Sequence, residues 1–125
     1  DQGIAVAPYS PLGGGLLSGK YAQGGTGRLT EDDRYAARYA PDWMHAAARG
    51  LSELASEVGL HPATLAVAWV ASHPAVTAPI ISARNAQQLA PSLAASDVTL
   101  DPDLMARLTA LTPTPAPATD RLEEV

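Results

Sequence analysis

Ile80-Ile81-Ser82-Ala83-Arg84-Asn85-Ala86-Gln87-Gln88-Leu89 joins an apolar run directly to a helical pattern. Asn85 is a favourable N-cap residue, and Gln88, three positions later, can return a hydrogen bond to the backbone of the cap, as in a capping box. We expect the helix to continue to about Leu93 or Ala94. Because a strand followed at once by a helix is the repeating unit of α/β proteins, this stretch favours that class.

A lone guanidinium, that of Arg84, lies where the expected strand ends and the helix begins. A helix N-terminus offers unpaired backbone N–H groups and about half a positive charge. Arginine adds planar, bidentate donors that suit a phosphate monoester. Arginines at helix starts are also commonly solvated, so the turn alone leaves phosphate binding and a plain surface charge both open.

The spacing of apolar residues predicts three further helices. The first is amphipathic and ends at Gly59, and its apolar positions are Met44, Ala47, Ala48, Leu51, Leu54, Ala55 and Val58. His61-Pro62 begins the second, which residues 65–71 make apolar nearly all round, so it must be largely covered, and His73-Pro74 stops it. Asp101-Pro102 caps the third, whose one-sided apolar stripe consists of Leu104, Leu108 and Leu111.

The first half of the chain is less regular. Residues 3–9 form a short apolar run without alternation, as expected of a strand buried on both faces, and residues 76–81 are the second expected strand. Between them, residues 10–29 form a long loop around three consecutive glycines, and loops of this length are commonly functional or mobile. Thr30 is predicted to cap a helix with acids in its first turn, although the residues up to Pro41 could also be irregular.

Alternating strands and helices point to a parallel sheet with helices outside it. Two strands cannot close such a sheet, and a (β/α)8 barrel needs eight strands and roughly 250 residues. The fold class is therefore α/β, an incomplete C-terminal part of a (β/α)8 TIM barrel with about two strands, covering helices and a Pro-rich tail. Because Asp1 is followed almost at once by an apolar segment, we expect the missing part upstream. Residues 1–111 form the barrel part, and residues 112–125 form the tail, with polyproline II expected at 112–117 and a polar terminus at 120–125.

Composition narrows the function classes. The 125 residues include 13 acidic and 8 scattered basic ones, for a net charge of −5, which argues against a nucleic-acid partner. No stretch reaches the roughly 18 apolar residues of a membrane span, and no signal peptide is visible, so no membrane partner is expected. The absence of cysteine suits the cytoplasm. The three histidines lack metal-ligand spacing, so no metal is expected.

Three segments together resemble the aldo-keto reductase family, in the order found at the C-terminal end of that barrel. They are residues 8–21 (PYSPLGGGLLSGKY), 65–70 (LAVAWV) and 80–89 (IISARNAQQL). The resemblance implies an oxidoreductase that binds NADP at the C-terminal face of the barrel and transfers hydride between NADPH and an aldehyde or ketone. A small carbonyl substrate is thus the implied partner of the full-length protein.

The resemblance also implies roles for residues of the long loop. Tyr9 would lay its ring against the nicotinamide, although a strand-end tyrosine can equally pack at the barrel rim. Ser10, Leu12 and Gly13 match the pyrophosphate loop of the family, where a backbone without side chains can approach the ligand closely, although glycines there could serve only a turn. Lys20 could approach the pyrophosphate or remain solvated.

The second group of implied cofactor residues follows the second expected strand. Arg84, with Ser82 and Ala83, matches the position that contacts the adenosine 2′-phosphate and would separate NADP from NAD. Gln88 matches a side chain near the 2′-phosphate or adenine, and its alternative is the capping box. Ser92 stands where many members carry an asparagine that contacts adenine, and Pro91 where many carry an acid, so this chain departs from the family there.

The catalytic residues of the family are not matched in this chain. The aspartate, tyrosine, lysine and histidine of the resembled enzymes belong to earlier strands, and Tyr21, Tyr35 and Tyr39 do not occur with such partners. We therefore assign no catalytic residue and expect the chain alone to be inactive. A regulatory protein similar to potassium-channel β-subunits and an inactive truncated remnant are the alternatives.

Overall fold

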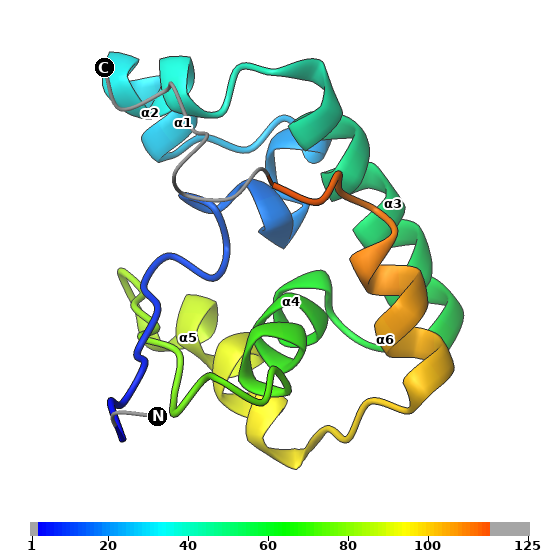
Figure 1. Cartoon of the computed structure of the whole chain (residues 1–125). Helices are drawn as coiled ribbons and strands as arrows, with labels where there is room; N and C mark the ends of the chain where they lie inside the picture. The colour runs from blue at the N-terminus through cyan, green and yellow to red at the C-terminus, as the bar shows by residue number, and fades with distance from the viewer. Residues whose placement is uncertain (1–2, 116–125) are drawn as a thin grey trace.

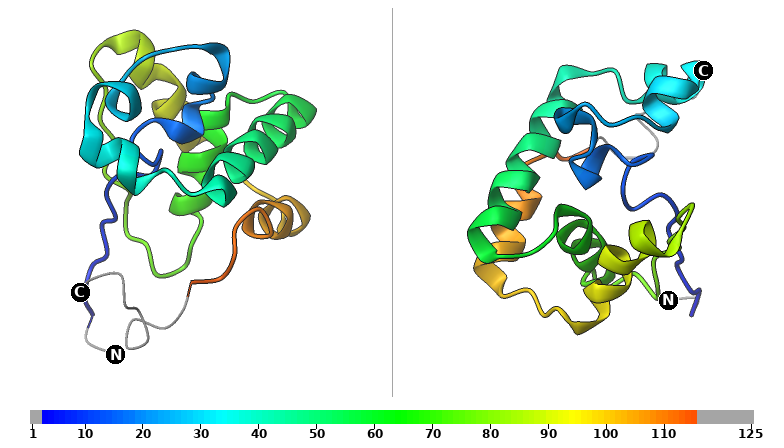
Figure 2. Two further views of the ribbon diagram at one scale, coloured as in Figure 1. Left: turned by 90° about the horizontal axis from the view of Figure 1, so that it is seen from above. Right: turned by 180° about the vertical axis from the view of Figure 1, so that it is seen from behind.

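Helices dominate the computed structural model, which describes residues 3–115 (Figure 1). The elements of this part are, in chain order, η1 (Leu16–Ser18), η2 (Tyr21–Gln23), α1 (Arg28–Glu31), α2 (Asp33–Arg38), α3 (Asp42–Val58), α4 (Pro62–Ala71), α5 (Ala86–Leu93), η3 (Ala94–Asp97) and α6 (Pro102–Thr109). The longest, α3, lies along one side with α6 beside it, and α4 lies between them and α5 (Figures 1 and 2).

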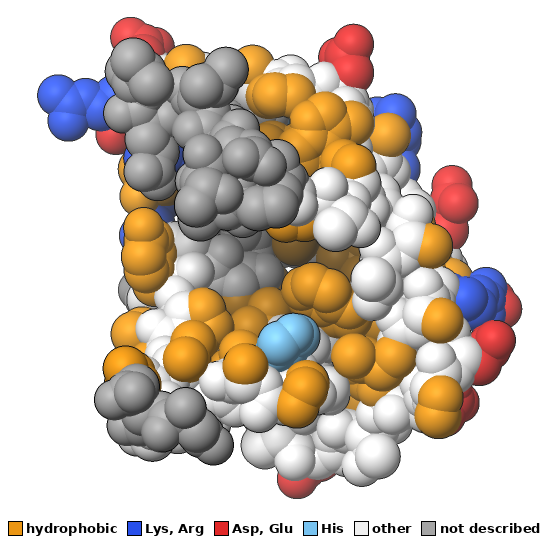
Figure 3. Space-filling model, in the orientation of Figure 1, with side chains coloured by type: hydrophobic (Ala, Val, Ile, Leu, Met, Phe, Trp, Pro, Cys, Tyr) orange, Lys and Arg blue, Asp and Glu red, His pale blue; other side chains and the backbone are white. Residues whose placement is uncertain are grey.

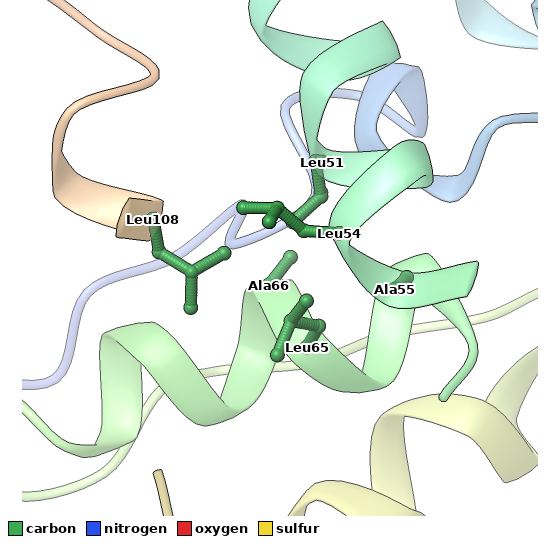
Figure 4. Packing of buried hydrophobic residues seen from close by; sticks show 6 residues of the cluster. All are labelled: Leu51, Leu54, Ala55, Leu65, Ala66 and Leu108. Atoms are coloured by element: carbon green, nitrogen blue, oxygen red, sulfur yellow. The ribbon is translucent and has the colours of Figure 1, made fainter. Parts of the chain in front are cut away.

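The main core forms where α3, α4 and α6 meet. Its buried residues are Leu51, Leu54 and Ala55 from α3, Leu65 and Ala66 from α4, and Leu108 from α6 (Figure 4). Leu65 is fully buried. The prediction that α4 must be largely covered is confirmed, because every residue from 63 to 68 is buried.

In each of the four longer helices, one end lies where the sequence predicts it and has a capping residue there. Gly59 ends α3 in a left-handed conformation at φ 72°, which glycine adopts without the penalty of a Cβ. The His61 ring nitrogen Nδ1 accepts from the Ala63 amide at 3.0 Å, and Pro62 occupies the first helical position of α4. Asn85 and Asp101 accept from the amides three residues later, at 2.9 and 2.8 Å. Local chemistry therefore sets where these helices begin and end.

The region before α3 differs from its prediction. Two short helices, α1 and α2, replace a single helix capped at Thr30. Asp32 is the cap of α2, and its carboxylate accepts from the amides of Arg34 at 2.9 Å and Tyr35 at 3.4 Å. The Thr30 hydroxyl instead bonds back to Gly27. Asp32, two residues after Thr30, is the better cap because its ionised carboxylate is the stronger acceptor.

The prediction of two strands was wrong for the part of the chain that the structure describes. Residues 3–9 and 76–81 do lie side by side in parallel, but only as a single bridge between Tyr9 and Ile80. The Ile80 amide donates to the Pro8 carbonyl at 2.8 Å and the Thr77 amide to the Val6 carbonyl at 2.8 Å. Pro8, like Pro79, has no amide hydrogen to extend the ladder, and the Val6 amide turns to the Thr77 hydroxyl at 3.1 Å.

A second buried cluster packs η3 against α4, and a hydrogen bond connects α5 to the same helix. Val67 and Ala68 of α4 and Ala95 of η3 are its buried members, with Ile81 and Val98 packed against them. The Thr64 hydroxyl also donates to the Pro91 carbonyl at 2.6 Å. These contacts hold the turn that carries Arg84 in a defined position relative to the core.

No single helix within residues 3–115 is long and apolar enough to cross a membrane, and α3 and α4, which have the length together, are bent by 99° at their junction. The predicted boundary at residue 111 falls just after α6 and stays a prediction. Residues 112–115 carry no helix or strand. The expectations for the rest of the polyproline segment and for the polar terminus fall on residues 116–125, outside the described residues.

Candidate functional site

A cleft of about 860 Å³ separates the start of the long loop from the turn and helix after residue 80. Its walls are contributed by residues 9–20 on one side and 80–92 on the other, with Arg28, His61 and Ala63 completing them. The two walls meet where residues 3–9 run beside residues 76–81, as the views of Figure 2 show. Segments about seventy residues apart in the sequence therefore form one surface.

Eight of the nine residues assigned to cofactor binding line this cleft. They are Tyr9, Ser10, Leu12, Ser82, Ala83, Arg84, Gln88 and Ser92. The ninth, Gly13, is not among the lining residues, although Gly14 and Gly15 are. A Cβ on Gly13 would face the Tyr39 ring at 3.3 Å. The cleft brings the two predicted groups together, and their contacts with a ligand stay predictions.

The glycine turn is held by its own hydrogen bonds. The Gly13 amide donates to the Ser10 carbonyl at 3.0 Å and the Gly15 amide to the Leu12 carbonyl at 3.1 Å. Gly13, Gly14 and Gly15 all have positive φ, at 56°, 64° and 94°. These two amides are already bonded, so the turn offers a ligand a close backbone approach more than a ring of free donors.

Ser10 has an unusual backbone conformation at the edge of the cleft. Its φ is 56°, in the left-handed region that non-glycine residues seldom adopt. Conformations of this kind cluster at ligand-binding sites, because the surrounding structure must hold them in place. Next to it, the Tyr9 side chain is 75% exposed in this chain, so the described residues do not provide the packed rim position considered above.

Arg84 is an exposed cation of the cleft, with 64% of its side chain accessible. Its guanidinium donates to the Glu31 carboxylate of α1 at 3.2 Å. Its backbone amide donates to the Gln88 side-chain oxygen at 3.3 Å. The capping-box expectation for Gln88 is therefore wrong in one respect: the side chain turns back to the amide before the cap and not to that of Asn85. Ser92, by contrast, is buried at 3% exposure.

The charge of the cleft is opposite to that of the chain. Of the seven lysines and arginines within residues 3–115, three line it, Lys20, Arg28 and Arg84, whereas none of the nine aspartates and glutamates described there is a lining residue. One of those nine, Glu31, is paired with Arg84. A concave surface lined by one sign of charge raises the local concentration of ions of the other sign. The electrostatics of the site therefore favour an anion with several charges spread along its length.

Sequence reasoning did not single out Arg28. It lies in the polar stretch that was expected only to be a loop, and no local motif marks it. In the structure, its guanidinium lies over the Tyr35 ring at 5.4 Å, while the Lys20 ammonium lies over the Tyr21 ring at 4.9 Å. The interleaving of basic and tyrosine residues from Lys20 to Tyr39 is the one signal that could have pointed to this arrangement.

The tyrosines that follow the glycine turn make contacts within the protein. The Tyr21 hydroxyl accepts from the Leu29 amide at 3.2 Å, and Tyr35 and Tyr39 stack with ring centroids 6.4 Å apart. Within residues 3–115, no group of three or more His, Asp or Glu side chains could hold a metal ion. On α3, hydrogen bonds from Arg107 and then its charge hold the pKa of Glu57 below its usual range.

Comparison with known proteins gives a matching family model and several curated relatives. Residues 1–113 match the model of the aldo/keto reductase family. An uncharacterized oxidoreductase, YrpG, of Bacillus subtilis is 35% identical over 116 residues, which cover 92% of this chain and 34% of that protein. A probable voltage-gated potassium channel subunit beta of rice is 34% identical, covering 87% of this chain and 35% of that protein. Protein tas of Escherichia coli is 30% identical, covering 88% and 32%.

The chain therefore spans about a third of the length of the curated relatives that it matches. The matched region contains both walls of the cleft. Since the family model covers nearly the whole chain, the assignment does not depend on any single motif. The chain belongs to the aldo/keto reductase family.

Proposed function

We propose that this chain is the cofactor-binding part of an NADP-dependent oxidoreductase that transfers hydride between NADPH and an aldehyde or ketone. The observation that carries the proposal is the cleft, whose lining residues within the described part of the chain include three cations and no carboxylate, on a chain of net charge −5. A dinucleotide with a pyrophosphate and a 2′-phosphate is an anion whose several charges are spread along its length, as the charges of the cleft favour. Its reduced nicotinamide is the hydride donor.

Each wall would bind one part of this cofactor. Arg84, at the start of α5, is proposed to bind the 2′-phosphate through charge-assisted hydrogen bonds. Lys20 and Arg28 are proposed to face the pyrophosphate across the glycine turn. The exposed ring of Tyr9 would provide a flat apolar surface for the nicotinamide. Ser92, a buried residue among those that line the cleft, would lie toward the adenine.

The larger fold is also part of the proposal. Ile4, Val6, Tyr9 and Ile80 are exposed by 77, 42, 75 and 55%, all on the paired segments 3–9 and 76–81. Hydrophobic side chains also gather over the middle of the face in Figure 3, while charged ones lie at its rim. Unpaired edges and exposed apolar side chains suit segments that become strands when neighbours pair with them. We infer that the chain completes a (β/α)8 barrel and, lacking the family's catalytic tetrad, is inactive by itself.

Arg84→Ala tests the cofactor assignment in the full-length protein. NADPH and NADH are titrated by nicotinamide fluorescence, with Arg49→Ala as a control for the loss of an exposed arginine elsewhere. We expect the preference for NADPH to fall by about 1.5 to 3 kcal/mol, roughly 10- to 150-fold, the range of charge-assisted hydrogen bonds. Equal losses for both cofactors would show that Arg84 does not recognise the phosphate.

A second function is favoured by a specific finding. The rice protein at 34% identity is named as a potassium channel subunit, and so is a 34% identical protein of Arabidopsis thaliana. A regulatory protein that keeps the cofactor site is thus the alternative proposal. Aldehyde-dependent oxidation of bound NADPH by the full-length protein distinguishes the two: turnover supports the reductase, whereas tight binding without turnover of any of a range of aldehydes and ketones supports the regulatory protein.

A further inference from the structure

The arginine proposed to bind the 2′-phosphate is already paired with a carboxylate of the same chain. The Arg84 guanidinium donates to Glu31 at 3.2 Å across 53 positions of sequence. Both side chains remain largely accessible, at 64% and 49%. A ligand phosphate can therefore reach the guanidinium, but it meets the Glu31 carboxylate there.

Helix α1 holds this carboxylate in place. The Glu31 amide donates to the Gly27 carbonyl at 2.9 Å, and the Leu29 amide donates to the Tyr21 hydroxyl at 3.2 Å. Three residues before Glu31, Arg28 lines the cleft. Helix α1 thus contributes the Arg28 side chain to the cleft and the Glu31 carboxylate to Arg84 on the opposite wall.

We propose that Glu31 is a tethered competitor for the phosphate at Arg84 and reduces the discrimination between NADPH and NADH. The inference rests on the proposed function. A 2′-phosphate that binds the guanidinium through both Nη groups takes the Nη2 donor from Glu31 and then lies close to the displaced carboxylate. NADH has a neutral hydroxyl at that position, so it leaves the pair intact. Glu31 therefore weakens the binding of NADPH and leaves the binding of NADH unchanged.

The size of the effect follows from the exposure of the pair. Exposed ion pairs are worth about 0.2 to 1 kcal/mol and are screened by salt. Displacing this one corresponds to roughly a 1.5- to 5-fold change in affinity. Glu31→Gln should tighten NADPH binding by that factor at low salt, and by less at high salt, because the carboxamide has the same shape without the charge.

The test is a double-mutant cycle in the full-length protein, read by titration with NADPH and NADH. The variants are Glu31→Gln, Arg84→Ala and both together, and Asp33→Asn is the control that removes one negative charge from the neighbouring helix. We expect Glu31→Gln to raise the NADPH/NADH preference, Asp33→Asn to leave it unchanged, and Glu31→Gln to have no effect once Arg84 is alanine.

Two results would overturn the inference while leaving the proposed function intact. One is a cofactor preference in Glu31→Gln equal to that of Asp33→Asn. The other is the same tightening whether residue 84 is arginine or alanine, since the carboxylate would then act by general repulsion and not through the pair. Failure of the unmutated protein to bind either cofactor would instead overturn the proposed function itself.

Discussion

Substitution of Gly14 by alanine tests how closely residues 20–41 pack against the glycine turn that forms one wall of the cleft. Gly14 has φ +64°, where an L-residue costs about 1 to 2 kcal/mol. Its added Cβ would lie 3.0 Å from Tyr35, 3.2 Å from Leu29 and 3.2 Å from Tyr39, all closer than ordinary van der Waals contact. Overpacking of this kind costs about 1 to 3 kcal/mol. The sum is a destabilisation of about 2 to 5 kcal/mol.

Gly24→Ala is the matched control for this variant. Gly24 has φ +78° but nothing within 4 Å of an added Cβ, so only the backbone cost of about 1 to 2 kcal/mol applies. Urea unfolding of the two variants of the full-length protein measures the difference. We expect Gly14→Ala to be less stable than Gly24→Ala by about 1 to 3 kcal/mol. Equal stability of the two would refute the packing of the tyrosines against the turn.

Two further predictions concern the scaffold. Leu65→Ala leaves a cavity at a fully buried site and should lower the free energy of unfolding by about 2 to 5 kcal/mol. The same change at Leu93, which is 55% exposed, should alter it by no more than about 0.5 kcal/mol. Comparable urea midpoints for the two variants would contradict the core described here. Because Arg107 lowers the pKa of folded Glu57, the stabilisation from this pair is present above the usual carboxyl pKa and is lost as the pH falls through the lowered value. Glu57→Gln should therefore lower Tm at neutral pH but not in strong acid, and a Tm difference independent of pH would disprove this coupling.

The parts of the fold that depend on local chemistry could be predicted from the sequence. Asn85, Asp101 and His61-Pro62 are caps whose hydrogen bonds involve residues only two or three positions away, and the structure confirms each. The burial of α4 followed from its apolar surface, since a helix without a polar face must be covered. The family could be predicted because its motifs are also local.

The remaining features depend on partners that are distant in the sequence. Residues 3–9 and 76–81 have the composition of strands, but one neighbour and two prolines leave them with a single bridge. The contribution of Arg28 to the cleft, and the pair between Glu31 and Arg84, arise because the loop folds back over more than fifty positions. The interleaving of basic and tyrosine residues from Lys20 to Tyr39 is the only pattern that points toward the first of these contacts, and no spacing predicts the pair between Glu31 and Arg84.

A crystal structure of the full-length protein with NADP⁺ tests the central claim most directly. It should show the 2′-phosphate within hydrogen-bond distance of the Arg84 guanidinium, the pyrophosphate between Lys20 and Arg28, and Glu31 displaced from its partner. A dinucleotide bound elsewhere, or one in this cleft whose 2′-phosphate makes no contact with Arg84, would contradict the account.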